Sequence, residues 1–488
     1  MNWSDNMLIT KNPELYSKIR GKKRLFIAPD SASWLILEGK DLEMFQRINR
    51  PMVISRFLQD NYPSSPMVGR IFLEKLFLND LIRISGKSYY NPEYLWKLPE
   101  KYPGFLCLHI TEACNMECKY CYASANRQKA RMDPDTAKKI VEKVLRELPV
   151  EYPTIDFHGG EPMLEFATMA EAARYGYEIC TKTNKQVRFI TQTNATLITK
   201  EKAKIMKELN IIPGVSLDGP EEIHDRYRVF PNGKGSFRQT WRGIQTLRDN
   251  GIEAGVLSVV HHPQDYPEVL KFFLEQGYTS MRINYSAYIG RAQQEMEFHY
   301  QRGEEFAKYF LQMVDEALAW CRKNNKTLRI QDLDQLINNL TSKTRPFMCY
   351  RSPCGIGNSI LGFGIEGGVY GCEEMASSCL YCLGNVNDDS LHLKKLVDGN
   401  EMLQFLSTRR TENIPRCRIC HLRRFHGIGC TSKVYAQFGD IFRESPMCRF
   451  YQVVLEELMW KLSENPDMVK FLNFGAADND IQLPPAGP

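Results

Sequence analysis

Three features that would place a protein in a membrane or on a nucleic acid are absent from the sequence. No uninterrupted apolar run reaches the about 18 residues that a membrane-spanning helix requires, and the N-terminal stretch lacks the apolar core of a secretion signal. An excess of charge of one sign is also missing, because 63 Lys and Arg residues oppose 58 Asp and Glu residues, for a net charge of +5. So small an excess predicts no nucleic-acid partner. We therefore expect a globular, cytoplasmic protein without membrane association.

Cysteine, in contrast, is abundant, with 15 residues in a chain of 488. Thiols stay reduced in the cytoplasm, so clustered cysteines there indicate metal or redox chemistry rather than disulfides. The length and the 43% hydrophobic content are enough for several folded units, and at roughly 100 to 200 residues per domain we expect about two to four.

Residues 1–98 carry no cysteine cluster and form a predicted module of their own. Two apolar runs, residues 24–28 and 33–37, flank a Pro29-Asp30 turn and predict a β-hairpin. Three amphipathic helical stretches follow. The last, residues 66–81, places five apolar side chains on one predicted face: Val68, Ile71, Phe72, Leu76 and Phe77. This order resembles the PqqD-like winged-helix module, which binds leader peptides. A docking or dimerisation module remains an alternative.

Residues 99–295 alternate apolar strands with amphipathic helices, which predicts repeated βα units and a parallel sheet. Six strands are expected, at residues 105–110, 154–157, 187–191, 212–217, 253–260 and 280–285. Six is fewer than the eight of a closed barrel, so the α/β fold is predicted to be a partial (β/α)6 barrel. Asp133 is the expected cap of the first helix, with Pro134 at its first position. A helical linker is expected over residues 296–345.

The segment CNMECKYC places Cys114, Cys118 and Cys121 in a C-x3-C-x2-C loop directly after the first predicted strand. Thiolates are the ligands that iron-sulfur clusters use, and three of them leave one iron of a [4Fe-4S] cluster open. The spacing resembles the radical S-adenosylmethionine (SAM) superfamily, whose cluster cleaves SAM to a deoxyadenosyl radical that abstracts hydrogen. The alternative is a three-thiol zinc site, which needs a fourth ligand.

The same resemblance implies a SAM-binding pocket at the ends of the predicted strands. The implied cofactor-binding residues are Tyr120, Gly159, Gly160, Glu161, Pro162, Asn194, Ser216, Asp218, Arg228, Gly290 and Arg291. Gly159 to Pro162 form a GGEP loop, which the resemblance assigns to the amino group of SAM. Helix capping is the alternative role for Ser216 and Asp218. A surface ion pair is the alternative for Arg228, and a plain loop is the alternative for residues 290–291.

Residues 346–465 resemble the SPASM extension, which holds two auxiliary iron-sulfur clusters. By position, the resemblance implies that the first cluster uses Cys349, Cys354, Cys372 and Cys430, and that the second uses Cys417, Cys420, His426 and Cys448. His426 stands where the family pattern has a cysteine. A neutral imidazole can ligate iron and tends to raise the potential of a cluster. Otherwise another group completes this cluster, or the cluster is incomplete.

Five cysteines lie outside these sets. Cys379 and Cys382 form a C-x2-C pair that supplies a replacement ligand, a redox pair, a substrate-facing thiol or two free structural thiols. Cys107, Cys180 and Cys321 lie in apolar contexts and are predicted to be packing residues. Residues 466–488 end in a Pro- and Gly-rich sequence and are predicted to be a flexible tail.

The resemblance as a whole implies an oxidoreductase that modifies a ribosomally made precursor peptide, with a leader sequence as the recognised partner. The bond formed would be a thioether or a carbon–carbon crosslink, and a low-potential flavodoxin or ferredoxin would donate electrons. An anaerobic sulfatase-maturing enzyme that makes formylglycine is the first alternative. An iron-sulfur winged-helix regulator is the second. The sequence singles out no catalytic base.

Overall fold

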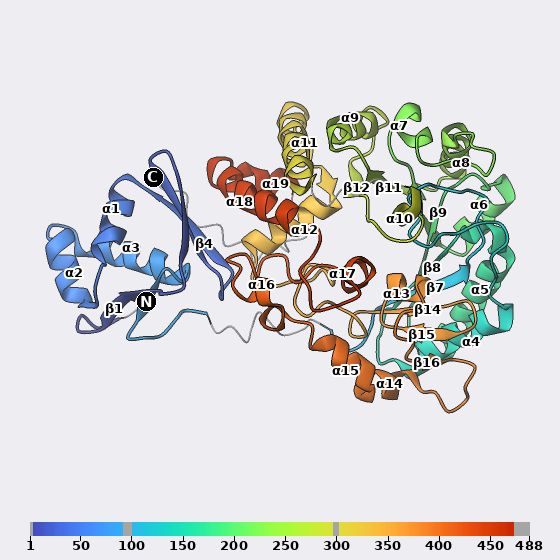
Figure 1. Cartoon of the computed structure of the whole chain (residues 1–488), viewed down its shortest axis with the longest axis horizontal. Coiled ribbons are helices and arrows are strands. Elements are labelled where there is room, and N and C mark those ends of the chain that lie inside the picture. The colour runs from blue at the N-terminus through green and yellow to red at the C-terminus, as the bar shows by residue number, and fades with distance from the viewer. Residues whose placement is uncertain (1–2, 91–99, 296–301, 473–488) are drawn as a thin grey trace.

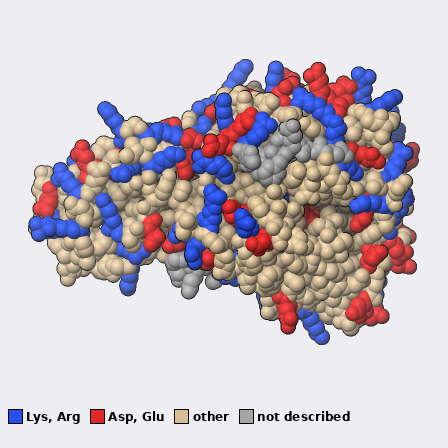
Figure 2. All heavy atoms as spheres, in the orientation of Figure 1, with Lys and Arg blue, Asp and Glu red and all other residues tan. Residues whose placement is uncertain are grey.

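The computed structural model describes residues 3–90, 100–295 and 302–472. An N-terminal module lies at one end of an elongated molecule and a strand-rich barrel at the other, with C-terminal helices between them (Figure 1). In the described residues, no helix is long and apolar enough to cross a membrane. Basic and acidic side chains are interspersed over the face that Figure 2 shows, without a large area of one sign.

The barrel is built on one sheet of ten strands, in the order β13-β12-β11-β10-β9-β8-β7-β14-β15-β16. The six predicted strands are all present, and neighbouring strands pair in parallel: β7 (Phe105–Thr111), β8 (Thr154–Gly159), β9 (Arg188–Thr193), β10 (Ile211–Ser216), β11 (Gly255–Val260) and β12 (Ser280–Tyr285). The prediction of an α/β fold with a partial barrel is therefore confirmed. The short β13 (Arg329–Ile330) extends the sheet beyond β12.

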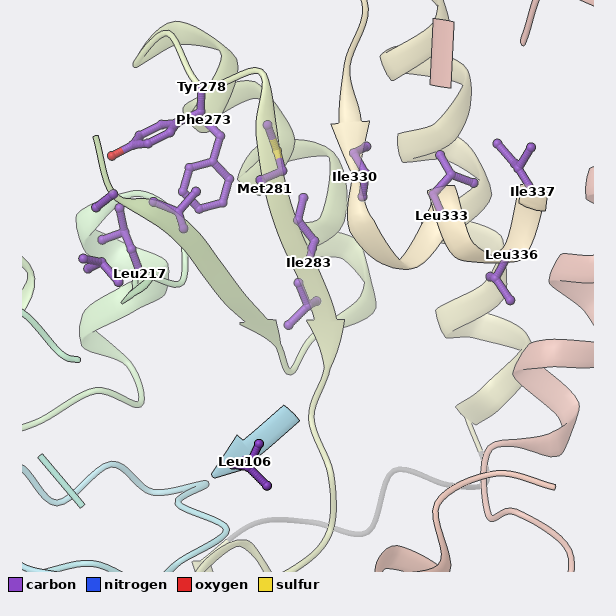
Figure 3. Close-up of a cluster of buried hydrophobic side chains, with 14 of the residues drawn as sticks. Leu106, Leu217, Phe273, Tyr278, Met281, Ile283, Ile330, Leu333, Leu336 and Ile337 are labelled. Atoms are coloured by element: carbon purple, nitrogen blue, oxygen red, sulfur yellow. The ribbon is translucent and has the colours of Figure 1, made fainter. Parts of the chain in front are cut away.

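Helices cover the outer face of this sheet: α4 (Pro134–Glu147), α5 (Phe166–Thr183), α6 (Lys200–Glu208), α7 (Glu221–Asp225), α8 (Phe237–Asp249) and α9 (Tyr266–Glu275). The side chain of Asp133 accepts hydrogen bonds from the amides of Asp135 and Thr136, so α4 begins as its sequence predicts. Alternate strand residues bury their side chains against these helices. Figure 3 shows part of this core, where apolar side chains from β12, β13, α9 and α12 form one cluster.

The C-terminal region continues the barrel sheet, which the sequence did not predict. β14 (Ile360–Phe363) pairs in parallel with β7, and β15 (Gly368–Tyr370) and β16 (Gly384–Asn385) follow in antiparallel pairing. The other elements are short α10 (Ala292–Glu295), α11 (Gly303–Asn324), α12 (Gln331–Thr341), α13 (Glu373–Ser377), α14 (Leu393–Gly399), α15 (Glu401–Ser407), α16 (Pro415–Arg418), α17 (Thr431–Phe438) and α18 (Cys448–Glu464). The cysteine-rich segment is thus fixed against the first strand of the barrel.

The flexible tail was predicted to begin at residue 466, but the chain is still folded there. Residues Asp467–Leu472 form helix α19, whose Met468, Val469, Phe471 and Leu472 are buried. These four apolar side chains join the main core, which explains why the chain stays packed past residue 466. The remainder of the predicted tail, residues 473–488, lies outside the described residues.

The N-terminal module contains two small sheets and three helices. One sheet has the order β2-β3-β4, with β2 (Tyr16–Arg20), β3 (Lys23–Ala28) and β4 (Ser33–Glu38), so the predicted hairpin is present with a third strand beside it. The other sheet pairs β1 (Leu8–Lys11) with β5 (Met52–Val53) and β6 (Ile82–Ile84). The helices are α1 (Gly39–Arg47), α2 (Ile54–Asn61) and α3 (Pro66–Leu78).

The predicted apolar face of α3 is wrong at two positions. Val68 and Ile71 are exposed, at 54% and 59%, and so is Met67 at 69%. The buried residues are instead Gly69, Phe72, Leu73, Leu76 and Phe77. A Cβ at Gly69 would lie 2.5 Å from the Leu58 side chain, so the helix packs closely on α2 at this glycine. Its first turn consequently presents apolar side chains to solvent.

The module is docked firmly on the rest of the molecule. Leu25, Ile27 and Trp34 of its hairpin belong to the main hydrophobic core, and the indole nitrogen of Trp34 donates to the Leu340 carbonyl at 2.8 Å. The ammonium of Lys343 donates to the carbonyls in the loop between β3 and β4, at Ser31 and Ala32. Lys18 and Arg20 of β2 pair with Glu456 and Glu457 of α18. The hairpin is therefore shared between two cores.

Candidate functional site

Cys114, Cys118 and Cys121 lie on the loop that follows β7, and their side chains share one apolar cluster with Met116. Two of the sulfurs already accept backbone hydrogen bonds, Cys114 from the Met116 amide and Cys121 from the Ala125 amide, each at 3.4 Å. Amide-to-sulfur hydrogen bonds stabilise thiolates that ligate iron. Burial, followed by the nearby Glu161 carboxylate and the two neighbouring thiols, raises the pKa of Cys114, so the thiolate form would need the positive charge of a bound cluster to stabilise it.

Gly290 and Arg291, which follow β12 in the chain, contact this loop. The guanidinium of Arg291 donates to the carbonyls of Cys118, at 2.7 Å, and of Ala125, and its amide donates to the Cys121 carbonyl at 2.9 Å. Gly290 has φ of +59°, and a Cβ there would lie 2.2 Å from the Tyr122 carbonyl oxygen. The sequence assigned this pair to SAM, and that role stays a prediction. The structure shows in addition that both residues contact the backbone of the three-cysteine loop directly.

The GGEP loop packs against the other side of the same segment. A Cβ on Gly160 would lie 2.2 Å from the Ala113 carbonyl oxygen, so only glycine permits this approach beside Cys114. The Glu161 carboxylate is buried and accepts from the Thr193 hydroxyl at 2.6 Å and from the Asn194 amide at 2.7 Å. Burial raises the pKa of Glu161 even though these bonds oppose the shift. Its side chain thus ties the ends of β8 and β9 together.

Tyr120, Asp218 and Arg228 meet in one buried network. The Tyr120 hydroxyl donates to Asp218 at 2.6 Å, and Arg228 Nε lies 3.0 Å from the same carboxylate oxygen. Asp218 is 0% exposed, and its other oxygen accepts from the Val259 amide. Although burial disfavours the charged guanidinium, Asp218 and Tyr120 raise the pKa of Arg228. Arg228 is therefore no surface ion pair, and it fixes the aromatic residue between two cluster cysteines.

Asn194 and Ser216 lie at the ends of β9 and β10. Asn194 donates to the Asn115 side chain at 2.9 Å and lies 3.9 Å from the Cys114 sulfur. The Ser216 hydroxyl accepts from Gln192 at 2.8 Å. Neither Ser216 nor Asp218 caps the helix that follows, since α7 begins after Pro220 without a side-chain cap. The structure thus brings the predicted pocket residues together around the three-cysteine loop.

The four thiols assigned to the first auxiliary cluster come from three segments of the C-terminal region: the loop with Cys349 and Cys354, the start of α13 and the start of α17. Burial is the main cause that raises the pKa of Cys372, and Cys354 and Cys349 raise it further. Burial likewise raises the pKa of Cys430, with Cys372 among its charged neighbours. Mutual effects of this kind require short distances between the sulfurs. The Cys430 thiol donates to Glu374 at 2.8 Å, which a metal-bound thiolate would not do.

Three residues assigned to the second auxiliary cluster also meet. Burial raises the pKa of Cys448, and Cys417 and Cys420 raise it further. His426 stacks on Tyr451, one turn after Cys448 in α18, with ring centroids 4.8 Å apart. Within the described part of the chain, no group hydrogen-bonds to its buried Nδ1, and burial lowers its pKa to about 4. A neutral ring with an unused nitrogen has the chemistry of a ligand, and ligation itself stays a prediction.

Cys379 and Cys382 are exposed and lie on a turn where Cys379 and Tyr381 have positive φ. Both thiols hydrogen-bond with the Tyr370 hydroxyl, whose pKa is raised by burial and then by these bonds. Tyr370 and Tyr381 pack with the side chain of Cys372. The pair therefore lies near the first auxiliary set, and its role stays open.

Sequence reasoning missed a polar cluster inside the barrel. Cys107 and His109 of β7 lie beside Asp156 and His158 of β8, and His158 Nε2 is 3.5 Å from Glu373 of α13. The Tyr122 hydroxyl donates to the same Glu373 oxygen at 2.5 Å. Burial raises the pKa of Asp156 to about 7. The available signal was the polar alternation C-x-H and D-x-H in strands of otherwise apolar sequence.

Comparison with known proteins identifies the barrel. Residues 108–274 match the family model of the radical SAM superfamily. This segment is a radical SAM domain. It runs from β7 into α9 and contains the three-cysteine loop and the GGEP loop. The cofactors of such a domain are a [4Fe-4S] cluster and SAM, so the cofactor prediction is confirmed at this level.

A cysteine-type anaerobic sulfatase-maturating enzyme of Clostridium novyi is 24% identical over 360 residues, covering 72% of this chain and 93% of that enzyme. The solved structure of native anSMEcpe with bound AdoMet superposes with a TM-score of 0.61 at 21% identity, over 74% of this chain and 98% of that one. Streptococcus suis SuiB bound to S-adenosylmethionine superposes with a TM-score of 0.53 at 14% identity, over 90% and 100%. At these identities the structures show a shared fold.

Proposed function

We propose that this protein is a radical SAM enzyme that modifies a ribosomally made precursor peptide by forming a thioether or a carbon–carbon crosslink. The observation that carries this proposal is the N-terminal module, whose hairpin is built into the core beside the C-terminal cysteine region. The SuiB superposition covers 90% of this chain and the anSMEcpe superposition 74%, which supports a module beyond the shared barrel. SuiB has been solved with its precursor peptide, SuiA.

We assign Cys114, Cys118 and Cys121 as ligands of the SAM-cleaving cluster. Held by these three thiolates, such a cluster would supply the reducing electron for SAM cleavage, the chemistry that starts hydrogen abstraction. The chain's own contribution is orientation: the Met116 and Ala125 amides point at two sulfurs, and Arg291 holds the loop carbonyls. Because the Glu161 carboxylate already accepts hydrogen bonds from Thr193 and Asn194, we propose that it shapes the pocket wall. Arg228 contacts Asp218 through Nε, and we propose that its terminal nitrogens face SAM.

The two C-terminal sets are proposed as the ligands of auxiliary iron-sulfur clusters. Between them lies the fully buried Arg409, which interacts electrostatically with Cys354 and Cys430 of one set and with Cys417 and Cys448 of the other. A buried guanidinium lowers the local cost of thiolate-ligated, negatively charged clusters. A low-potential flavodoxin or ferredoxin is the proposed electron donor, and the cytoplasm is the proposed location.

The leader peptide is proposed to bind the N-terminal module. The exposed apolar side chains of Met67, Val68 and Ile71 on α3 provide a surface for apolar leader residues, and the sheet β2-β3-β4 offers edges for an added strand. Deleting residues 1–98 would remove part of the main core as well, because Leu25, Ile27 and Trp34 pack there. Point substitutions on the exposed surface are therefore the cleaner test.

We expect Ile71→Asp to weaken leader binding about 10-fold or more, because burying an isoleucine side chain contributes roughly 1.5 to 3 kcal/mol. Fluorescence anisotropy with labelled leader peptides encoded beside the gene measures this affinity. Ile19→Asp on β2, 65% exposed, makes the same apolar-to-acidic change at the edge of the sheet β2-β3-β4 and therefore tests the second proposed surface separately. Equal affinity of wild type and Ile71→Asp would remove this surface from the proposal. A loss only in Ile19→Asp would move the leader to the β2 edge.

Formylglycine formation is the second candidate, favoured by the similarity to the sulfatase-maturating enzyme of C. novyi. Mass spectrometry of two reactions separates the candidates. A neighbouring precursor peptide should lose hydrogen and gain a crosslink, while a sulfatase peptide should remain unchanged. The reverse result would favour sulfatase maturation. A regulator of the iron-sulfur winged-helix class would form no deoxyadenosine with either peptide after reduction.

A further inference from the structure

Four chemically reactive side chains from two neighbouring strands point into the barrel. In the register of β7 and β8, Cys107 lies opposite Asp156 and His109 lies opposite His158. The residues that alternate with them, among them Leu108 and Phe157, pack in the core on the helix-facing side of the sheet. Because successive strand residues face opposite sides, the thiol, the carboxylate and both imidazoles share the inner face.

Three of these groups are close enough to bind one ion. Ligand atoms of Cys107, His109 and His158 all lie within 4.8 Å of one another. In a tetrahedral zinc site, Zn–N bonds of about 2.0 Å and a Zn–S bond of about 2.3 Å keep donor atoms roughly 3.3 to 3.6 Å apart. Small side-chain rotations of about 1 Å therefore close the gap, with no change in the strands that carry the residues.

A second observation points to a ligand in the same place. His109 is 2% exposed, and no described group hydrogen-bonds to its buried Nε2. Asp156 is 7% exposed, and its buried Oδ1 is likewise without a partner among the described residues. Buried polar atoms nearly always have a partner in a protein, a water or an ion. A cation bound between the two strands would give a partner to the His109 ring on β7 and to the Asp156 carboxylate on β8.

We propose that Cys107, His109 and His158 bind a zinc ion inside the barrel. The Asp156 carboxylate, opposite Cys107 in the strand register, lies outside this group of three and would become the fourth donor by rotating its side chain. One thiolate, two imidazoles and a carboxylate are donors that Zn²⁺ takes in four-coordinate sites. Cys107, His109 and Asp156 are buried, and the His158 side chain is 15% exposed, so solvent access to the site is limited, as it is in structural zinc sites. This site shares no ligand with the proposed iron-sulfur sites, and it does not depend on the peptide-modifying function.

Neighbouring residues supply the outer contacts that such a site needs. Ligating histidines commonly donate their second N–H to a carboxylate, which fixes the ring. Glu373 Oε1 lies 3.5 Å from His158 Nε2, where it would accept that proton while Nδ1 bound the ion. Ion binding at Nδ1 would replace its present contacts with the Gly159 amide and with the Tyr122 hydroxyl, 3.2 Å away. Tyr122 follows Cys121 and Glu373 follows Cys372, so the ion would lie between the two proposed cluster sites.

The test is metal analysis of the protein with its iron-sulfur clusters in place, after equilibration with Zn²⁺ and removal of the excess. Elemental analysis should find bound zinc in the wild type, and His109→Ala should lose about one equivalent with its iron content unchanged. Cys180→Ala, which removes a buried helical thiol, is the matched control and should keep the zinc. A wild type that binds no zinc, or a His109→Ala variant that retains all of it, would overturn the proposal.

X-ray absorption at the zinc edge gives a second readout that does not depend on activity. We expect one sulfur neighbour at about 2.3 Å and nitrogen or oxygen neighbours at about 2.0 Å. His109→Cys should keep the ion and raise the sulfur count from one to two, which guards against a variant that merely misfolds. Three sulfurs in the wild-type spectrum would instead place the zinc on one of the two three-cysteine sets, Cys114, Cys118 and Cys121 or Cys417, Cys420 and Cys448, and refute the barrel site.

Discussion

The two cysteine regions of this molecule are assembled in different ways. Cys114, Cys118 and Cys121 lie on a single loop, and the loop's own amides point at their sulfurs. The C-terminal thiols come from segments that span residues 349 to 448, a stretch that includes β14, which pairs with the barrel strand β7. A site on one loop depends mainly on local backbone geometry. A site collected from many segments depends on the packing of the whole domain.

One arginine in each region donates hydrogen bonds to backbone carbonyls, and the two arginines differ in how many segments they contact. Arg291 donates to two carbonyls on one loop. Arg409, 0% exposed, donates to carbonyls of two separate segments, at Ile428 and Gly429 and at Ile441 and Arg443. The Arg291 guanidinium contacts a single loop, while the Arg409 guanidinium joins two segments that lie on either side of α17.

The largest expected effect is the loss of SAM cleavage while the iron of the C-terminal region is retained. Replacing Cys114, Cys118 and Cys121 together with Ala should abolish deoxyadenosine formation, because the SAM-cleaving cluster loses all its protein ligands. The auxiliary iron should remain, since its proposed ligands lie elsewhere in the fold. Chromatography of the nucleoside product and iron analysis measure both outcomes. Deoxyadenosine made by the triple variant would contradict the assignment of this loop.

The second effect compares the two arginines. We expect Arg409→Met to lower the free energy of unfolding by roughly 3 kcal/mol or more, because several buried carbonyls lose their donor. Auxiliary iron should be lost in this variant. Arg291→Met should cost only about 1 to 2 kcal/mol and affect the SAM-cleaving cluster alone. Denaturant unfolding and iron release to a chelator, followed by EPR, measure both. Equal effects of the two variants would remove the distinction between a local and an assembled site.

The smallest expected effect concerns His426 in the assembled region. If His426 ligates the second auxiliary cluster, His426→Cys should retain the cluster and lower its reduction potential, because an anionic donor replaces a neutral one. His426→Ala should lose iron. Cys379→Ala and Cys382→Ala are the matched controls. Iron loss in one of these cysteine variants, together with an unaltered EPR spectrum in His426→Ala, would assign the fourth ligand to the exposed pair instead.

Asp133, Val68 and Ile71 show which features of the fold depend on neighbouring sequence and which depend on tertiary packing. Asp133 caps α4 as its sequence predicts, since the cap bonds reach only two and three residues along the chain. Val68 and Ile71 were predicted to be buried and are exposed, because the close approach of Gly69 to α2 decides which side of α3 faces inward. Helical periodicity indicates that an apolar face exists, but its direction depends on the neighbouring helix.

The sequence by itself determined the six parallel strands, the three-cysteine loop and the cysteine spacings, because strand periodicity and metal-ligand spacing are short-range patterns. Only the tertiary structure decided that β14 extends the barrel, that Arg228 is buried against Asp218, and that Cys107 lies beside two histidines. These contacts join residues that are ten to more than two hundred positions apart, as from Cys107 to His158 or from β7 to β14. Their pairing depends on sheet register and packing, which no local pattern encodes.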